Sequence, residues 1–467
     1  MADLVGRALD RLAARLPGRV SMPGDDGYAA ATAIWSKPVG RMPRAVIHCQ
    51  TADDVRLAIG AARDCDLPLS VRGGGHDWAG RALCDGMVID LSGMRRVTVG
   101  SDGAARISGG ARGADVLAIT HSLGLVAVTG SVGAVGMAGL TLGGGYGPLI
   151  GRFGLALDNL VEAEVVLADG RVVLANDADE AELLWALRGG GGNFGVVTEM
   201  HCRLHDLTSV RTGLLIYPFT EAKAILNSCA EIATSAPEEL SFQVGLVVGA
   251  GGAPVVMIVP TWCGAPEEGE ARLAPFLQLG TLLANTVAAT PYTAALTIFD
   301  PYLVHGQREL METRWLPALD SGSIDAFILA METSVSPGCA VFTHEFKGAG
   351  SRVPADATAF GLRRDHVLVE ILATFVDGPD GLAEQRHRQW ARATRESFNA
   401  TALPGGYPNL LTADDSDRVA RSYGPNAERL IKAKRRYDPD NVFRSAIPLP
   451  VAAARAAAHD PLVNAAA

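Results

Sequence analysis

Hydrophobic and polar positions alternate in short blocks from about residue 40 onward. The apolar runs Val46–Gln50 and Leu69–Arg72 have the length and composition of strands. Between them, apolar residues recur at helical spacing as far as Asp64, and Thr51 and Asp54 are placed to cap that helix. The pattern predicts a strand–helix–strand unit that runs directly into a glycine-rich turn.

A second group of elements follows, up to residue 206. Asp169-Gly170 separates the apolar runs Ala163–Leu167 and Arg171–Ala175, and this is a strong hairpin signal because glycine accepts positive φ. An amphipathic helix is predicted at Asp177–Leu187, followed by a strand at Val196–Leu204. Further strands are predicted at Met87–Leu91, Val97–Val99, Ala105–Ser108 and Val126–Thr129, with a helix at about 113–123.

Residues 207 to about 400 have sparser glycine and longer hydrophobic strands that alternate with helices, which favours an α+β fold with a second domain. The strands are expected at Leu240–Val248, Val255–Pro260, Val341–Phe346 and Val367–Phe375, and the helices at 221–235 and 381–398. We therefore divide the chain into a helical segment (1–39), a first domain (40–206), a second domain (207–404), a C-terminal segment (405–450) and an alanine-rich tail (451–467) that we expect to be disordered.

Composition and charge narrow the possible functions. The 467 residues carry a net charge of −10, and 48% are hydrophobic, so a large core can form and a basic nucleic-acid-binding face is not expected. No apolar run reaches the ~18 residues that a membrane span needs. The N-terminal stretch has regularly spaced arginines and no apolar signal core, so we expect an amphipathic helix and a cytoplasmic protein.

The seven cysteines are widely and irregularly spaced, which argues against a disulfide framework or a CxxC metal site, and we expect no metal. Glycine is abundant, with 53 residues, and gathers in four turns. Successive backbone N–H groups in such turns can hold an anion such as a diphosphate without side-chain charge. The turns are Arg72–His76, Gly130–Gly139, Gly143–Gly151 and Gly189–Gly195.

Other nucleotide and hydrolase motifs do not fit these turns. Gly190–Gly195 matches G-x-G-x-x-G, but it follows a predicted helix and opens a strand, which is the reverse of the nicotinamide-dinucleotide arrangement. The lysine-containing phosphate loop and the HExxH motif are absent, and no GxSxG lies in a strand–turn–helix context.

Seven motifs follow one another in a characteristic order: Arg72-Gly-Gly-Gly-His76, Asp85–Ser92, Gly130–Gly147, Gly154–Asn159, Leu184–Thr198, Tyr407-Pro-Asn409 and Tyr437–Arg444. This order resembles the berberine bridge enzyme-like family of FAD-linked oxidases, within the vanillyl-alcohol oxidase superfamily. The resemblance covers about residues 40–450 and is closest to singly His-linked bacterial members such as 6-hydroxynicotine oxidase and antibiotic-pathway oxidases.

The resemblance implies a PCMH-type FAD-binding domain of two subdomains and a substrate domain whose antiparallel sheet, flanked by helices, covers the flavin. The C-terminal segment is expected to return to the FAD-binding domain. Relatives often have Asn-Gln before their closing Ile-Pro-Pro, whereas Phe443–Pro448 lacks these residues, so any polar contact from them is in doubt.

In the family, the histidine of RGGGH bonds covalently to the flavin, and His76 matches it; the alternative is a histidine that only hydrogen-bonds in a turn. Many members add a thioether from a cysteine at the position of Val132, so a single linkage is predicted. Val135 matches a position where valine accompanies oxygen reactivity, although ordinary packing is equally open. The positions matched to cofactor binding are Arg72, Gly73, Gly74, Gly75, His76, Asp77, Thr129, Gly130, Ser131, Val135, Gly136, Gly139, Gly144, Tyr146, Gly147, Asn159, Gly195, Val197, Tyr407 and Asn409.

Tyr407 and Tyr146 match the tyrosines that act as bases in sugar- and aglycone-oxidising relatives. A tyrosine has an ordinary pKa of ~10, so a base near neutral pH needs a lowered pKa or a partner; packing or substrate binding is the alternative. Glu370 interrupts an apolar strand and is a third candidate, unless that face is solvated.

Four weaker candidates for the site come from the same domain: His344, Glu345, Arg308 and Trp315. The implied activity is transfer of a hydride from a small organic metabolite to FAD and of electrons to O₂, in secondary metabolism. The alternatives are a dehydrogenase with another acceptor and an inactive flavin-binding carrier. The oligomeric state is not predicted.

Overall fold

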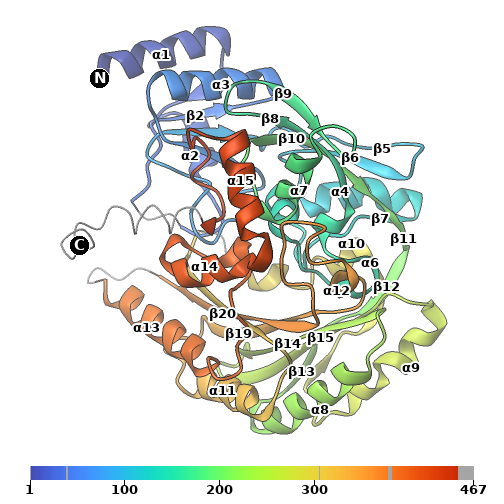
Figure 1. Cartoon of the computed structure of the whole chain (residues 1–467). Coiled ribbons are helices and arrows are strands. Elements are labelled where there is room, and N and C mark those ends of the chain that lie inside the picture. Colours follow the sequence, from blue (N-terminus) through green and yellow to red (C-terminus); the bar gives the residue numbers. More distant parts are fainter. Residues whose placement is uncertain (1, 38–39, 304–305, 377–380, 451–467) are drawn as a thin grey trace, which may run out of the picture.

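The computed structural model describes residues 2–37, 40–303, 306–376 and 381–450, and its elements form two halves (Figure 1). The upper half in this view holds a four-stranded sheet, a five-stranded sheet and a two-stranded ribbon, and the lower half holds one large sheet with helices on the side away from the upper half. The α+β class is confirmed. The alanine-rich tail lies outside the described residues.

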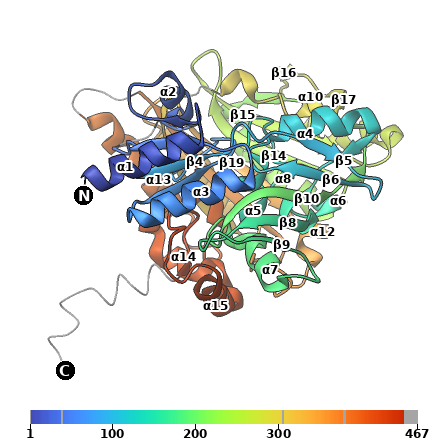
Figure 2. The same ribbon diagram turned by 90° about the horizontal axis from the view of Figure 1, so that it is seen from above.

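The first small sheet has the order β1 (Val20–Ser21), β2 (Ala45–His48), β4 (Met87–Asp90), β3 (Leu69–Arg72), and β2 and β3 both run parallel to β4. The predicted cap is confirmed, because the Thr51 side chain and Asp54 form a capping box at the start of α3 (Ala52–Asp64). The helix α1 (Ala2–Arg15) lies beside α3 (Figure 2). Residues 1–39 also contain α2 (Asp26–Thr32) and the strand β1, so this segment is not purely helical.

The second small sheet is antiparallel, in the order β5 (Val97–Val99), β6 (Ala104–Ser108), β10 (Val196–Arg203), β8 (Leu160–Val166), β9 (Val172–Ala175), and the predicted β8–β9 hairpin is confirmed. The helix predicted from Asp177 begins later, as α7 (Ala181–Gly190). The strand predicted to Thr129 is only β7 (Leu125–Val126), paired with β11 (His205–Asp206). The other helices are α4 (Gly113–Thr120), α5 (Met137–Gly143) and α6 (Ile150–Phe153).

The large sheet has nine strands, and all its neighbouring strands are antiparallel. Its main order is β16 (Ala284–Asn285), β13 (Leu215–Pro218), β15 (Pro254–Trp262), β14 (Leu240–Val248), β19 (Cys339–Phe346), β20 (His366–Phe375), β18 (Arg308–Leu316), with β12 (Ser209–Thr212) and β17 (Ala288–Pro291) beside it. One face packs on α8 (Ala222–Ser235), α11 (Ser321–Glu332) and α13 (Leu382–Ser397) around a large apolar core. The short helices α9 (Gly269–Leu273), α10 (Tyr292–Ala295) and α12 (Ala349–Arg352) complete this half.

The C-terminal segment contributes α14 (Ser416–Ser422) and α15 (Ala427–Tyr437), and α15 lies against α7 of the first half (Figure 1). The buried ammonium group of Lys434 donates hydrogen bonds to the Asp438 carboxylate and to the backbone carbonyls of Asn193 and Phe443. This network ties the segment to the glycine turn before β10. No helix in the described ranges combines the length and apolar character that spanning a membrane requires.

Candidate active site

Three of the four glycine turns meet backbone to backbone. A Cβ on Gly74 would lie 2.5 Å from the Cα of Gly136, and a Cβ on Gly147 would lie 2.0 Å from the carbonyl oxygen of Thr129. Such distances are too short for any side chain, so only glycine permits these approaches. The turns at 73–75, 130–136 and 143–147 therefore form one continuous backbone surface.

His76 closes the first of these turns in a cage of aromatic rings. Its imidazole stacks on Trp35 with 4.3 Å between ring centroids and meets the edge of Trp78 at 5.7 Å. The backbone N–H of Trp35 donates a 2.8 Å hydrogen bond to the carbonyl of Gly75, which fixes the indole against the turn. The sequence analysis missed Trp35, and no local signal marks it.

Two predicted cofactor side chains are engaged in holding the first turn in place. Arg72 is buried, and its guanidinium group lies 3.0 Å from the carboxylate of Asp90. The same carboxylate also contacts His48. Asp77 accepts hydrogen bonds from the backbone N–H groups of Ala79 and Ala82 and so closes the next turn. The side chains of Arg72 and Asp77 therefore stabilise the fold of this turn.

Four more predicted positions are satisfied within the protein. Thr129 hydrogen-bonds the Gly130 carbonyl and the Tyr292 hydroxyl, and both ends of the Asn159 amide have protein partners. Gly195 packs on β8, and the side chain of Val197 is part of the core. A ligand could reach these residues only through their backbone.

The two predicted tyrosines lie together, with 4.8 Å between ring centroids. The Tyr407 hydroxyl oxygen accepts hydrogen bonds from the backbone N–H of Gly145 and from Nδ2 of Asn409, both at 2.9 Å. These donors lower its pKa, but burial outweighs them and raises the pKa of Tyr407 to about 12.

Tyr146 has a different partner, His366, which the sequence analysis did not identify because it lies one residue before the predicted strand; the observed strand β20 begins at His366. The Nδ1 of His366 donates to the carbonyl of Arg364 at 2.7 Å, so Nε2 is the acceptor of the 2.6 Å hydrogen bond from the Tyr146 hydroxyl. Burial lowers the pKa of His366 to about 3 and raises the pKa of Tyr146 well above its usual value, so both are neutral.

The large sheet supplies a polar cluster that we call the sheet triad: Gln243, His344 and Glu370. The Gln243 amide nitrogen lies 3.1 Å from both ring nitrogens of His344, and His344 Nε2 lies 3.4 Å from a Glu370 carboxylate oxygen. The imidazole of His344 meets the ring of Tyr146 edge to face, with 6.5 Å between ring centroids, so the triad faces the tyrosines.

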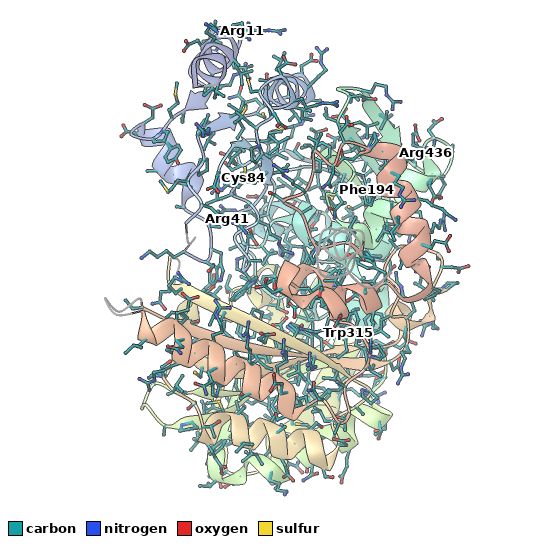
Figure 3. The ribbon with its side chains drawn as sticks, turned by 60° about the vertical axis from the view of Figure 1, so that its left-hand side comes forward. Arg11, Arg41, Cys84, Phe194, Trp315 and Arg436 are labelled. Carbon is teal, nitrogen blue, oxygen red and sulfur yellow. The ribbon has the colours of Figure 1, made fainter. Side chains whose placement is uncertain are left out.

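Two of the weaker candidates lie on the wrong face of the sheet. Glu345 alternates with His344 and points toward the helices, where it accepts from the Phe242 backbone N–H. Arg308 likewise points to α13 and pairs with Glu384 at 2.6 Å. Trp315, which is labelled in Figure 3, does lie on the site face. There it packs in an apolar cluster with Tyr146 and Tyr407.

The closing residues Ile447 and Pro448 of the C-terminal segment are held through their backbone carbonyls. Nδ2 of Asn193 donates to the carbonyl of Ile447, and the hydroxyl of Tyr423 donates to the carbonyl of Pro448. These bonds anchor the closing segment without the Asn-Gln pair that relatives carry.

The arrangement fits a flavin nucleotide. The joined turns offer backbone N–H groups to a diphosphate, and no described atom lies within 4 Å of where a Cβ on Gly139 would be, which leaves that backbone open to a ligand. His76 and the tyrosines flank this surface from different sides. Val132 is half-buried, and all seven cysteines are free thiols.

Comparison with known proteins agrees with this fit. Residues 43–176 match the FAD binding domain family, and residues 406–450 match the berberine and berberine-like family. The chain is 30% identical to (R)-6-hydroxynicotine oxidase of Paenarthrobacter nicotinovorans over 92% of this chain and 96% of the relative. It is also 30% identical to the FAD-linked oxidoreductase pgmH of Aspergillus terreus over 91% of this chain and 92% of the relative.

The fold agrees as well. The crystal structure of 6-hydroxy-D-nicotine oxidase from Arthrobacter nicotinovorans superimposes with a TM-score of 0.83 at 28% identity and covers 93% of this chain and 98% of the other. The two relatives are named as an oxidase and an FAD-linked oxidoreductase, each matches more than nine-tenths of this chain, and this chain is an enzyme of the same class. The chain belongs to the berberine bridge enzyme-like family of FAD-linked oxidoreductases.

Proposed function

We propose that this enzyme is an oxidase that removes a hydride from a small organic metabolite, holds its FAD covalently through His76, and delivers the electrons to O₂. The observation that carries the proposal is the meeting of Tyr146, Tyr407 and the sheet triad above the joined glycine turns. FAD, when bound, supplies the hydride acceptor. We place the reaction in secondary metabolism, where a relative's name, 6-hydroxynicotine oxidase, offers a small-molecule precedent.

Tyr407 is our choice for the residue that takes the substrate proton. Its oxygen already accepts hydrogen bonds from the Gly145 backbone N–H and the Asn409 side-chain amide, and these donors stabilise the negative charge that develops on the oxygen as its own proton leaves. Because burial raises the pKa of Tyr407 to about 12, its hydroxyl is neutral at rest. We therefore propose a relay in one step: the Tyr407 oxygen takes the substrate proton while its own proton passes to the Glu370 carboxylate, and the hydride leaves the substrate carbon for the acceptor that FAD supplies when bound.

Tyr146 is better suited to position the substrate than to accept a proton from it. Its hydroxyl donates to the neutral Nε2 of His366, whose low pKa keeps that nitrogen an acceptor throughout the neutral range. We propose that Tyr146 orients the substrate through its phenol oxygen, and that Glu370 with His344 binds the polar group next to the reacting carbon.

A single covalent linkage follows from the residues around His76. A neutral imidazole nitrogen is a nucleophile in the physiological pH range, and stacking on Trp35 holds the ring in one plane. Val132 cannot form the thioether. Val135, half-buried in the second turn, supports oxygen as the acceptor.

Two measurements on the holoenzyme test the proposal without a known substrate. The intact mass of the denatured protein should exceed the polypeptide mass by one FAD, and His76→Ala should return the polypeptide mass. Enzyme reduced anaerobically with dithionite should regain its flavin absorbance rapidly in air with one H₂O₂ formed per flavin. A reduced flavin that persists in air would favour the dehydrogenase alternative.

The assignment of Tyr407 is tested with any compound that bleaches the holoenzyme anaerobically. Tyr407→Phe should slow flavin reduction by roughly 10²–10⁴-fold, the usual contribution of general acid–base catalysis. Tyr146→Phe, which keeps the ring but loses the bond to His366, serves as the matched control and should mainly raise the apparent dissociation constant. If Glu370→Gln slows flavin reduction by this factor and Tyr407→Phe does not slow it, Glu370 rather than Tyr407 is the base.

A further inference from the structure

The large sheet has one face turned toward the FAD-binding half. On this face, the two ends of strand β18 limit the space in which a ligand can lie. At one end of β18, Trp315 packs with Tyr146 and Tyr407. At the other end, Glu309 lies beside the indole of Trp35, which stacks on His76. The strand positions between Trp315 and Glu309 that share this face are Thr313 and Met311.

Polar side chains on this face are few, and most are already engaged. The Thr313 hydroxyl accepts a hydrogen bond from Arg418, the Ser241 hydroxyl donates to the Pro148 carbonyl, and Thr261 is bonded to Thr212. Among the described residues in the middle of the face, the sheet triad is what remains to meet a polar group. These three side chains are all half-buried and lie together.

Next to the triad the face is apolar, in a set of residues that we call the Phe342 strip. Register places Phe342 between Gly245 and Glu370, and Leu372 between Ala340 and Met311. Met257 pairs with Gly245 and extends the strip onto β15. The strip consists of Gly245, Met257, Met311, Phe342 and Leu372.

Gly245 allows the phenyl ring of Phe342 to lie across the neighbouring strand. A Cβ on Gly245 would stand 2.6 Å from Cδ1 of Phe342, so any larger residue would push the ring out of place. Phe342, Leu372 and Met311 are half-buried although they are large and apolar, whereas Val341 and Ile371 on the opposite face are fully buried. An uncovered apolar surface inside a site is a place for an apolar ligand.

The two features together select a class of substrate. A sugar carries a hydroxyl on almost every carbon and would leave most of them without partners over the Phe342 strip, which costs binding free energy. A flat ring compound with a single polar substituent matches both, since its rings can cover Phe342 and Leu372 while the substituent meets Glu370 and His344.

We propose that the enzyme accepts a flat, mainly apolar aromatic or alicyclic ring compound, bound with its polar substituent at the sheet triad and its rings on the Phe342 strip. The inference rests on the proposed function, because it assigns the substrate class of the same site. It makes Phe342 a specificity residue that touches the substrate and moves no proton.

Binding to the oxidised holoenzyme tests the inference without turnover. 2-Naphthol and cellobiose are titrated separately, and the change in the flavin absorption spectrum is followed to saturation. We expect saturable binding of 2-naphthol and none of cellobiose. Phe342→Ala should weaken 2-naphthol binding by about tenfold, the loss expected for an aromatic contact with its buried area.

Control variants separate the loss of a contact in the site from a general effect of substitution on the folded protein. Leu329→Ala removes an exposed leucine on α11, on the helix side of the same sheet, and should leave the dissociation constant unchanged. Met311→Gln provides a second, milder change within the strip in case Phe342→Ala is unstable, and it should also weaken 2-naphthol. Unchanged affinity in both strip variants, failure of 2-naphthol to bind, or tighter binding of cellobiose would each overturn the inference. Slow re-oxidation of the dithionite-reduced enzyme would overturn the oxidase proposal alone.

Discussion

At the scale of single residues, neighbours in one strand meet opposite environments. Glu345 follows His344 in β19 but lies on the helix face, where its carboxylate oxygen accepts from the Phe242 N–H at 3.2 Å and lies 3.6 Å from the Lys347 ammonium group. Burial disfavours the charged carboxylate more than Lys347 and the hydrogen bond favour it, so the pKa of Glu345 rises to about 7.

This pKa makes stability depend on pH in a definite direction. Because the folded state holds the Glu345 proton more tightly than the unfolded state, the stabilisation is complete below the unfolded pKa of ~4.3 and is lost as pH rises through about 7. Glu345→Gln cannot titrate, so its free energy of unfolding should improve relative to the wild type by up to ~3 kcal/mol between pH 4.5 and 8.5. Urea unfolding midpoints at a series of pH values measure this difference.

The matched control is Glu332→Gln, which changes an exposed glutamate at the end of α11 and should follow the wild-type curve at every pH. If the stabilities of Glu345→Gln and the wild type change in parallel across this range, the Glu345 carboxyl is ionised in the folded protein at all these pH values. Burial would then not raise its pKa.

At the scale of elements, the joining of the first two glycine turns is a steric condition for the cofactor surface. A Cβ at residue 74 would lie 2.5 Å from the Cα and 2.6 Å from the nitrogen of Gly136, and both of those atoms belong to the backbone. Gly74→Ala must therefore separate the two turns. We expect FAD content to fall several-fold and stability to fall by about 1–3 kcal/mol, the usual cost of overpacking.

The ratio of flavin to protein absorbance and the urea midpoint measure these two effects. Gly60→Ala is the matched control, since no described atom lies within 4 Å of its new Cβ and the site is in the exposed interior of α3, where alanine should stabilise by about 0.5–1 kcal/mol. Full FAD content in Gly74→Ala would mean that the turns can move apart without affecting the cofactor.

Local signals predicted some elements and missed others for physical reasons. The capping box at Thr51 and the Asp169-Gly170 hairpin depend on neighbouring residues, and both appear as expected. Helix α5 was missed because its glycine-rich sequence has low helix propensity and is stabilised by packing in the core. Strand β18 was missed because its charged residues hide the alternation, and their partners are distant in sequence.

At the scale of the whole molecule, the site is assembled from three separate parts of the chain. Tyr146 comes from the glycine turns, the sheet triad from the large sheet, and Tyr407 from the C-terminal segment. The motif resemblance identified both tyrosines. Strand alternation showed that Glu370 lies on the face opposite its neighbours, but it could not show whether that face meets the site or solvent. That His344 faces Glu370 while Glu345 faces the helices depends on how the sheet docks, which no local pattern contains.

A buried ion pair inside the C-terminal segment helps to hold the segment against the first half, because its lysine also bonds to that half. Lys434 and Asp438 are 2.6 Å apart and almost fully buried, and Lys434 also binds the Asn193 carbonyl beside β10. Lys434→Ala would leave a buried carboxylate without its cation, which typically costs 3–5 kcal/mol and is therefore expected to lower stability by about that amount. Because the segment also carries Tyr407, the variant should lose Tyr407 from the site as the segment detaches.

Lys432→Ala on the same helix is the matched control, because Lys432 pairs with Glu428 on the exposed side and its loss should change little. Limited proteolysis of both variants, followed by mass spectrometry of the fragments, would show whether cleavage begins after residue 404. Detachment of the segment predicts early cleavage there in Lys434→Ala alone. Under the proposed linkage through His76, which lies far upstream, FAD should stay on the large fragment. Cleavage that begins instead within the FAD-binding half would mean that the buried pair stabilises the first domain itself rather than the docking of the segment.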